Sequence, residues 1–139
     1  MGGRLICGII EKGQKVAQSI DEIIISPQSD MAYVRTRLSV LGYEFLDEDM
    51  VKEDGKYYNI MKLAYGPDHS ERYDEVYEFY GRYLIEKNHP VLKEYLKDEQ
   101  KKLTAVLQKL GDKRYGERYR QIMHIVGINN KAQEMMGLH

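Results

Sequence analysis

The stretch from residue 43 to residue 62, YEFLDEDMVKEDGKYYNIMK, constrains the fold most, because it has the pattern of a β-hairpin. Its second arm, residues 57–61, is rich in side chains that suit a pleated, half-buried surface. Asp54 and Gly55 lie between the arms and tolerate the positive φ angles of a tight hairpin turn. A two-stranded hairpin is barely stable alone. The preceding chain is therefore predicted to supply the rest of a sheet.

Length and composition limit the class of protein. A chain of 139 residues can bury one modest core, or a small core with a helical appendage. The net charge of -1 gives no long-range electrostatic field that would indicate binding to nucleic acid or to a membrane. No apolar run approaches the roughly 18 residues of a membrane span, and the first residues lack the order of a signal peptide.

The single cysteine, Cys7, lies in an apolar run. It excludes a disulfide within the chain, which indicates a reducing, cytoplasmic location. We interpret Cys7 as a small core residue rather than a nucleophile.

A helix is predicted to start directly after Met1-Gly2-Gly3 and to be weakened in its middle by Gly13. Its apolar residues fall roughly on one face at helical spacing; they are Leu5, Ile6, Ile9, Ile10, Val16, Ala17 and Ile20. A chain that opens on a helix start is expected to be part of something longer.

An unbroken apolar run at residues 22–26 is typical of a buried strand in a parallel sheet. A loop follows, in which Ser29 or Asp30 is predicted to cap a helix from Met31 to Leu41. The alternation of helix and strand predicts an α/β fold, with a parallel sheet that ends in the antiparallel hairpin.

Residues 66–70 (GPDHS) are a plausible boundary between two units, 1–66 and 67–139, and the second unit has a helical pattern throughout. Pro90 is predicted to start a helix that carries an apolar seam flawed by Glu99; the seam positions are Leu92, Leu96, Leu103, Val106 and Leu110. After a turn near Gly111, a last helix is expected to pack back as an antiparallel hairpin. Its apolar residues are Tyr115, Tyr119, Ile122, Met123 and Val126, and Gly127 and Asn129-Asn130 are expected to loosen its end.

Ligands of open parallel sheets bind beyond the C-terminal ends of the strands, and three segments are predicted to meet there. The segments contribute Gly2 and Gly3, then Pro27, Gln28 and Ser29, and lastly Asp54. Paired glycines let a ligand approach the backbone, and a helix start offers free N–H donors. A plain junction between loop and helix explains the same pattern. Two roles are open for the Gln28 side chain: a hydrogen bond from its amide to a polar ligand, or the capping of a helix.

The acidic residues of the hairpin resemble a metal cluster, but strand alternation would scatter them over two faces, so we interpret them as a solvated acidic edge; they are Asp47, Glu48, Asp49, Glu53 and Asp54. The four histidines, at positions 69, 89, 124 and 139, lack metal-ligand spacing, so no metal site is predicted.

Basic residues concentrate between Lys87 and Arg120, interleaved with acids. A solvated helix face with paired charges explains most of them. The tip of the helical hairpin favours RNA contact, because cations gather there beside Tyr115 and Tyr119; they are Lys109, Lys113, Arg114, Arg118 and Arg120.

Three long motifs, IIISPQSD, DEDMVKEDGKYYNIM and EFYGRYLIEKNHPVLKEYLKDE, together resemble the bacterial tRNA (adenine-22-N1)-methyltransferase family. The resemblance implies a Rossmann-like, S-adenosylmethionine-dependent methyltransferase domain followed by a coiled-coil helical domain that holds tRNA. It implies that Gly2, Gly3, Pro27, Gln28, Ser29 and Asp54 line the rim of the pocket where methyl donor and adenine meet.

The resemblance covers the back part of the family's pattern and nearly all of this chain. It implies that the family's first strand, cofactor-binding loop and ribose-binding acid lie outside the sequence, so this chain alone is expected to be inactive. The alternative is a non-catalytic module that holds RNA or dimerises. Without a parallel neighbour, the strand at residues 23–25 has a bare edge. Self-association through that edge or the coiled coil is therefore expected.

Overall fold

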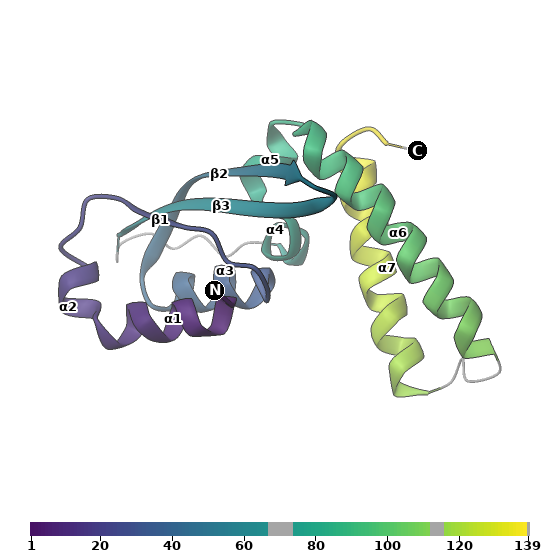
Figure 1. Cartoon of the computed structure of the whole chain (residues 1–139), viewed down its shortest axis with the longest axis horizontal. Coiled ribbons are helices and arrows are strands. Elements are labelled where there is room, and N and C mark those ends of the chain that lie inside the picture. The colour runs from purple at the N-terminus through teal and green to yellow at the C-terminus, as the bar shows by residue number, and fades with distance from the viewer. Residues whose placement is uncertain (67–73, 112–115, 139) are drawn as a thin grey trace.

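The computed structural model describes residues 1–66, 74–111 and 116–138. The expected boundary at 66–70 falls mostly outside these ranges. The elements follow in the order α1 (Gly3–Lys12), α2 (Gln14–Ala17), β1 (Ile23–Ile25), α3 (Met31–Val40), β2 (Tyr43–Glu53), β3 (Lys56–Tyr65), α4 (Glu75–Tyr80), α5 (Arg82–Glu86), α6 (Pro90–Leu110) and α7 (Glu117–Met135). Figure 1 shows a sheet with α1 and α3 along one face, and a two-helix arm of α6 and α7 that projects from one end.

The sheet has the strand order β1-β3-β2, and both pairings are antiparallel. Because β3 is antiparallel to both neighbours, β1 and β2 run in the same direction, as the alternation with α3 predicted. Strand β3 lies between these two strands, so β1 and β2 do not pair with each other directly. Strand β1 pairs on one side only, and Ile24 is 65% exposed there.

The hairpin forms as predicted, with Asp54 at φ 51° and Gly55 at φ 77° in a two-residue turn. A bulge between Phe45 and Asp47 adds one residue, Leu46, to β2. The bulge shifts the alternation by one residue, so that Glu48 and Met50 face inward after Tyr43 and Phe45.

The first core lies between the sheet and the helices α1 and α3; its fully buried members include Cys7, Val34, Leu38, Phe45, Met61 and Leu63. Burial raises the pKa of the Cys7 thiol, which agrees with its interpretation as a core residue. The predicted single apolar face of the first helix is only partly correct. Ile6, Ile10 and Ala17 are buried, whereas Leu5, Ile9, Val16 and Ile20 are exposed.

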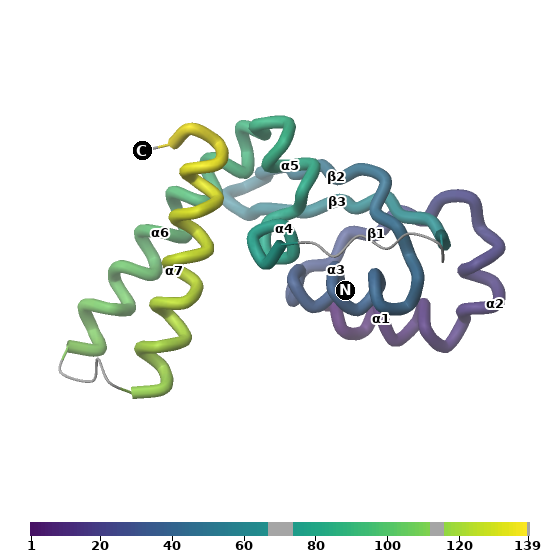
Figure 2. The backbone as a smooth tube through the Cα atoms, turned by 180° about the vertical axis from the view of Figure 1, so that it is seen from behind, coloured from purple at the N-terminus to yellow at the C-terminus, as the bar shows by residue number. Residues whose placement is uncertain are grey.

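The second core joins the sheet to the arm; it includes Met50 of β2, Val76, Tyr80 and Leu84 of α4 and α5, Leu92 and Leu96 of α6, and Ile128 and Ala132 of α7. Helix α4 ends at Gly81, whose φ of 91° breaks the helical pattern that the sequence runs through this point. Figure 2 shows α4 and α5 between the sheet and the arm.

The arm is an antiparallel pair of long helices (Figure 1). Pro90 occupies the first turn of α6, as predicted, and His89 caps it by accepting a hydrogen bond from the Val91 N–H. The expected loosening of the last helix is wrong, because α7 runs through Gly127 to Met135. Asn129 and Gln133 are buried in it and donate hydrogen bonds to α6, which holds this end in place.

Candidate functional site

The start of α1 meets the loop that follows β1, as the sequence predicted. The Gln28 N–H donates to the Met1 carbonyl at 3.0 Å, and the Gly3 N–H donates to Ser29 Oγ at 3.3 Å. Pro27 is buried, while the side chain of Gln28 is exposed. Five of the six predicted rim residues therefore lie together at one junction.

Ser29 caps a different helix from the one expected. Its hydroxyl accepts from the first turn of α1, across the junction, while α3 has no side-chain cap. The N-cap position of α3 belongs to Asp30, but its left-handed backbone, with φ 57° and ψ 43°, leaves its side chain without a capping hydrogen bond.

Gly3 is required by close contacts inside the protein. A Cβ on Gly3 would lie 2.3 Å from the Ser29 carbonyl oxygen and 2.6 Å from Val34 Cγ2. A Cβ on Gly2 would lie 3.2 Å from Ser29 Oγ. The paired glycines thus bring the α1 backbone against the loop, and the exposed amide of Gln28 adds a donor and an acceptor beside it. The junction therefore combines close backbone packing with an exposed polar side chain.

A cation lies beside the junction. The Arg4 guanidinium lies 4.1 Å from the centre of the Tyr33 ring and 3.8 Å from Asp30 Oδ1. Arg4 remains 66% exposed. The electrostatic character of this rim is therefore mixed, with one exposed cation and one exposed carboxylate.

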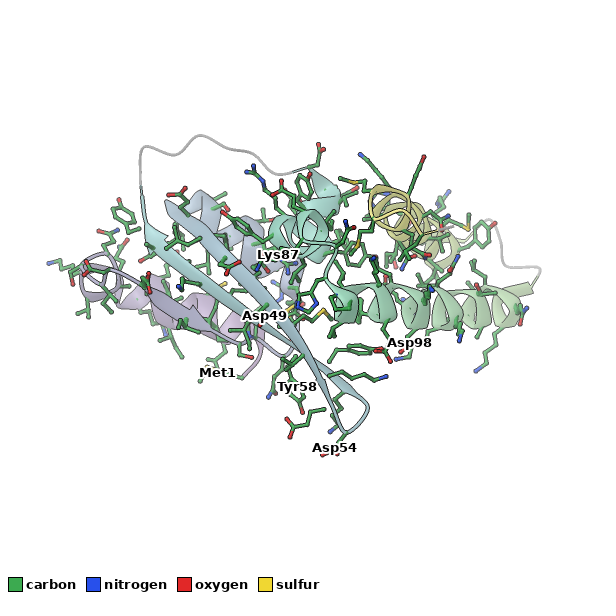
Figure 3. The ribbon with its side chains drawn as sticks, turned by 90° about the horizontal axis from the view of Figure 1, so that it is seen from above. Met1, Asp49, Asp54, Tyr58, Lys87 and Asp98 are labelled. Atoms are coloured by element: carbon green, nitrogen blue, oxygen red, sulfur yellow. The ribbon has the colours of Figure 1, made fainter. Side chains whose placement is uncertain are left out.

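Asp54 does not join the rim. Strand β1 ends at Ile25, opposite Met61, and β3 extends five residues beyond that point to Lys56. At about 3.3 Å per residue, the turn lies roughly 17 Å further along the sheet. Figure 3 shows Asp54 at the tip of the projecting hairpin, away from Met1. The direction predicted for this turn is right, but the length of the hairpin carries it past the junction.

The predicted RNA-binding tip is described only in part. Lys109 lies near the end of α6, and Arg118 and Arg120 lie near the start of α7, all three exposed. Arg120 also lies 3.5 Å from Glu117 of its own helix. Lys113, Arg114 and Tyr115 fall outside the described residues.

The prediction that the acidic residues of the hairpin form a solvated edge is wrong for Glu48. Glu48 is 3% exposed and pairs with Arg35, which is 1% exposed, at 2.8 Å. The sequence missed this pair because the bulge at Leu46 turns Glu48 inward.

The Lys87 ammonium lowers the pKa of Asp47, while the Met50 N–H and then His89 lower the pKa of Asp49. No group of acids, histidines or cysteines within the described ranges could hold a metal ion.

Glu99, expected to be a flaw in the seam, is the centre of a polar cluster. It accepts hydrogen bonds from the hydroxyls of Tyr80 and Tyr95 and from Asn129 Nδ2. These donors come from three different helices, α4, α6 and α7. Glu99 therefore stabilises the joint between the arm and α4.

Comparison with known proteins relates this chain to one family. A family model of tRNA (adenine(22)-N(1))-methyltransferases matches residues 1–131. The curated tRNA (adenine(22)-N(1))-methyltransferase of Bacillus subtilis (strain 168) is 32% identical over 76 residues, or 55% of this chain.

Two solved structures share the fold. An NADB-Rossmann superfamily protein from Streptococcus agalactiae matches 95% of this chain with a TM-score of 0.85 and 23% identity. Sp1610 from Streptococcus pneumoniae, solved in complex with S-adenosyl-L-methionine, matches 95% with a TM-score of 0.81 and 22% identity. These likenesses confirm the predicted Rossmann-like fold. The chain spans 32% of the curated relative and 56% of each solved chain.

Proposed function

The chain belongs to the tRNA (adenine(22)-N(1))-methyltransferase family, and from this membership we propose that it takes part in methylating N1 of an adenine in tRNA. S-Adenosylmethionine would supply the methyl group. The observation that carries the proposal is the junction of Gly2 and Gly3 with Pro27, Gln28 and Ser29. There the start of α1 and the C-terminal end of β1 meet, where α/β sheets bind their ligands.

The reaction depends on the positioning of the two reactants more than on covalent catalysis by the protein. The lone pair of adenine N1 attacks the methyl carbon in line with the departing sulfur, so both reactants must be held close and aligned. N1 lies on the pairing edge of the base, so the adenine must be unpaired to reach a pocket. In this proposal the rim holds the base, and the exposed Gln28 amide hydrogen-bonds its polar edge.

The arm would hold the rest of the tRNA. Its tip carries Lys109, Arg118 and Arg120, and these cations suit contacts with phosphates. Lys113 and Arg114, which lie outside the described residues, are further candidates from the sequence alone. We assign coiled-coil packing to the α6–α7 seam on the positions Leu92, Leu96 and Leu103, which are buried at four- and seven-residue spacing. Asp54, at the hairpin tip, would meet substrate only where the RNA extends past the rim.

Self-association is a second part of the proposal. Strand β1 leaves one edge of the sheet unpaired, and Ile24 is exposed on it. Exposed strand edges pair with other strands, so a second copy would add to β1. Light scattering of the chain, compared with an Ile24→Lys variant, tests this directly; a monomer in both samples would exclude it. The free, buried Cys7 supports a cytoplasmic location as part of the proposal. No described helix is long and apolar enough to cross a membrane.

Methyl transfer to a tRNA transcript tests the proposed activity. The donor would be labelled S-adenosylmethionine, and a transcript in which the target adenine is replaced by guanine is the matched control. Incorporation into the adenine transcript alone supports the proposal. A calorimetric titration of the donor into the same sample shows whether the rim binds it.

The alternative is a non-catalytic module that holds RNA through the exposed cations at the tip of the arm, Lys109, Arg118 and Arg120. A tRNA mobility shift separates the two functions. A salt-sensitive shift without methyl transfer supports the module, and no shift at low salt contradicts both.

A further inference from the structure

Helix α6 carries lysines at every fourth position on its outer face: Lys93, Lys97 and Lys101. Residues four apart lie above one another, about 6 Å along the axis. The buried residues Leu92, Leu96 and Leu103 lie on a different side of α6, and Leu92 and Leu96 pack in the second core. Lys97 and Lys101 are exposed and Lys93 is half-buried, so the lysine row faces solvent.

The acidic residues beside the lysine row, Glu94 and Asp98, contact the hairpin. Lys52 of β2 lies 2.5 Å from Glu94 Oε1, and the Tyr57 hydroxyl of β3 donates to Asp98. These contacts engage the acids of α6 with the hairpin. In the described part of the chain, no carboxylate lies within ion-pair distance of the lysine row.

A shallow hollow of about 320 Å³ lies along the same face; its lining residues are Gln100, Lys101, Thr104, Ala105 and Gln108. Thr104 and Ala105 are small, and Lys101 and the two amides provide hydrogen-bonding groups around them. A polyanion with polar sugars and bases fits this combination better than an apolar partner does.

Figure 3 shows α6 on the same side as Met1, Tyr58 and the hairpin tip at Asp54, with α7 on the opposite side. Figure 2, seen from behind, shows α7 in front of α6. Helix α6, rather than α7, therefore lies on the side of the arm nearer the rim.

We propose that the phosphodiester backbone of the RNA substrate runs along Lys93, Lys97 and Lys101 on its way to the rim. The inference rests on the proposed function and adds a binding surface on the shaft of the arm to the cations at its tip. The acids Glu94 and Asp98 hold the shaft against the hairpin, and the lysine row beside them is left for phosphates.

Salt-dependent binding to a fluorescent tRNA transcript tests this surface. The variant Lys97→Gln/Lys101→Gln removes two phosphate contacts without touching a buried residue. We expect several-fold weaker binding, and a slope of log affinity against log salt concentration that is shallower by about 1.5 units. Lys97→Arg/Lys101→Arg should retain the wild-type slope, because both charges remain.

The control Lys12→Gln/Lys15→Gln makes the same change in net charge on exposed residues at the far end of the sheet. It should leave the slope unchanged. An unchanged slope in the α6 variant, with tRNA still bound, overturns the lysine row but leaves the proposed function standing. Equal losses in both variants mean diffuse attraction and also overturn it. Absence of wild-type binding at low salt removes RNA as the partner and ends both proposals.

Discussion

The guanidinium of Arg35 on α3 lies 2.8 Å from the carboxylate of Glu48 on β2, with both side chains buried. Arg35 also donates from Nη1 to the Glu78 carbonyl of α4 at 2.8 Å. One arginine thus joins the sheet, α3 and the helix that leads to the arm. Because each partner neutralises the other away from water, the pair acts as a unit.

Removing one partner should be costly. Arg35→Met leaves the Glu48 carboxylate buried without its cation, and the free energy of unfolding should fall by about 3–5 kcal/mol. Urea unfolding followed by circular dichroism measures this. The double variant Arg35→Met/Glu48→Met is the control and should lose less than Arg35→Met alone, because no unpaired charge remains. A single variant as stable as the wild type would show that the pair is not buried in solution.

Gly81 should tolerate no side chain. Its φ is 91°, and a Cβ would lie 2.9 Å from Glu48 Oε1 and 3.1 Å from Arg35 Nη2. Gly81→Ala should therefore destabilise the protein by more than 1 kcal/mol, about the cost of a left-handed residue alone. Gly127→Ala is the matched control. Its Cβ would meet nothing within 4 Å inside α7, so it should stabilise by up to about 1 kcal/mol. Equal thermal shifts in both variants would contradict this account.

Alkaline pH should weaken the joint at Glu99. Burial, followed by the Glu99 carboxylate, raises the pKa of Tyr80 and of Tyr95 well above the usual value near 10. In the unfolded chain both phenols lose protons from about pH 10, whereas in the fold they keep them. The stabilisation is complete below that pH and is lost as pH rises further.

The alkaline effect is measured by unfolding at several pH values, with phenolate absorbance as the probe. Tyr80→Phe should make the fall in stability above pH 10 shallower by about one proton. Tyr58→Phe, at a half-buried position on the hairpin outside the Glu99 cluster, is the matched control for the loss of one phenol hydroxyl. Two buried tyrosines that titrate near pH 10 in the folded protein would disprove the buried cluster.

The features predicted correctly from the sequence are those that depend on residues close together in the chain. Asp54-Gly55 dictates a tight turn and Pro90 a helix start, each from residues that lie close together in the chain. The motifs also identified the family, and with it the fold.

The missed features depend on residues far apart in the sequence. The burial of Glu48 follows from a bulge and from Arg35, and the role of Glu99 follows from tyrosines and an asparagine on other elements. The sequence brought Gly2 and Gly3 beside Pro27, Gln28 and Ser29 because two short segments meet there, and their role as a ligand-binding rim stays a prediction. Asp54 lies apart from them, because strand length, unlike strand direction, cannot be judged from a turn.

The angle of the arm should depend on Tyr57. Its ring packs edge-on against Tyr95, with centroids 5.2 Å apart, and its hydroxyl donates to Asp98. Tyr57→Ala removes both contacts between hairpin and α6. The aromatic contact alone should cost about 0.5–1.5 kcal/mol, and the arm should sample more orientations.

Spin labels at Ile24 on β1 and Thr104 on α6, both exposed, in a Cys7→Ala background, would report the distance between sheet and arm. The Tyr57→Ala variant should broaden this distance distribution. Tyr58→Ala is the control, since successive strand residues point to opposite faces, and it should keep the wild-type width. Equal widths in all three samples would mean that the second core, with Met50 and Leu96, sets the angle by itself, because those buried contacts remain in every variant.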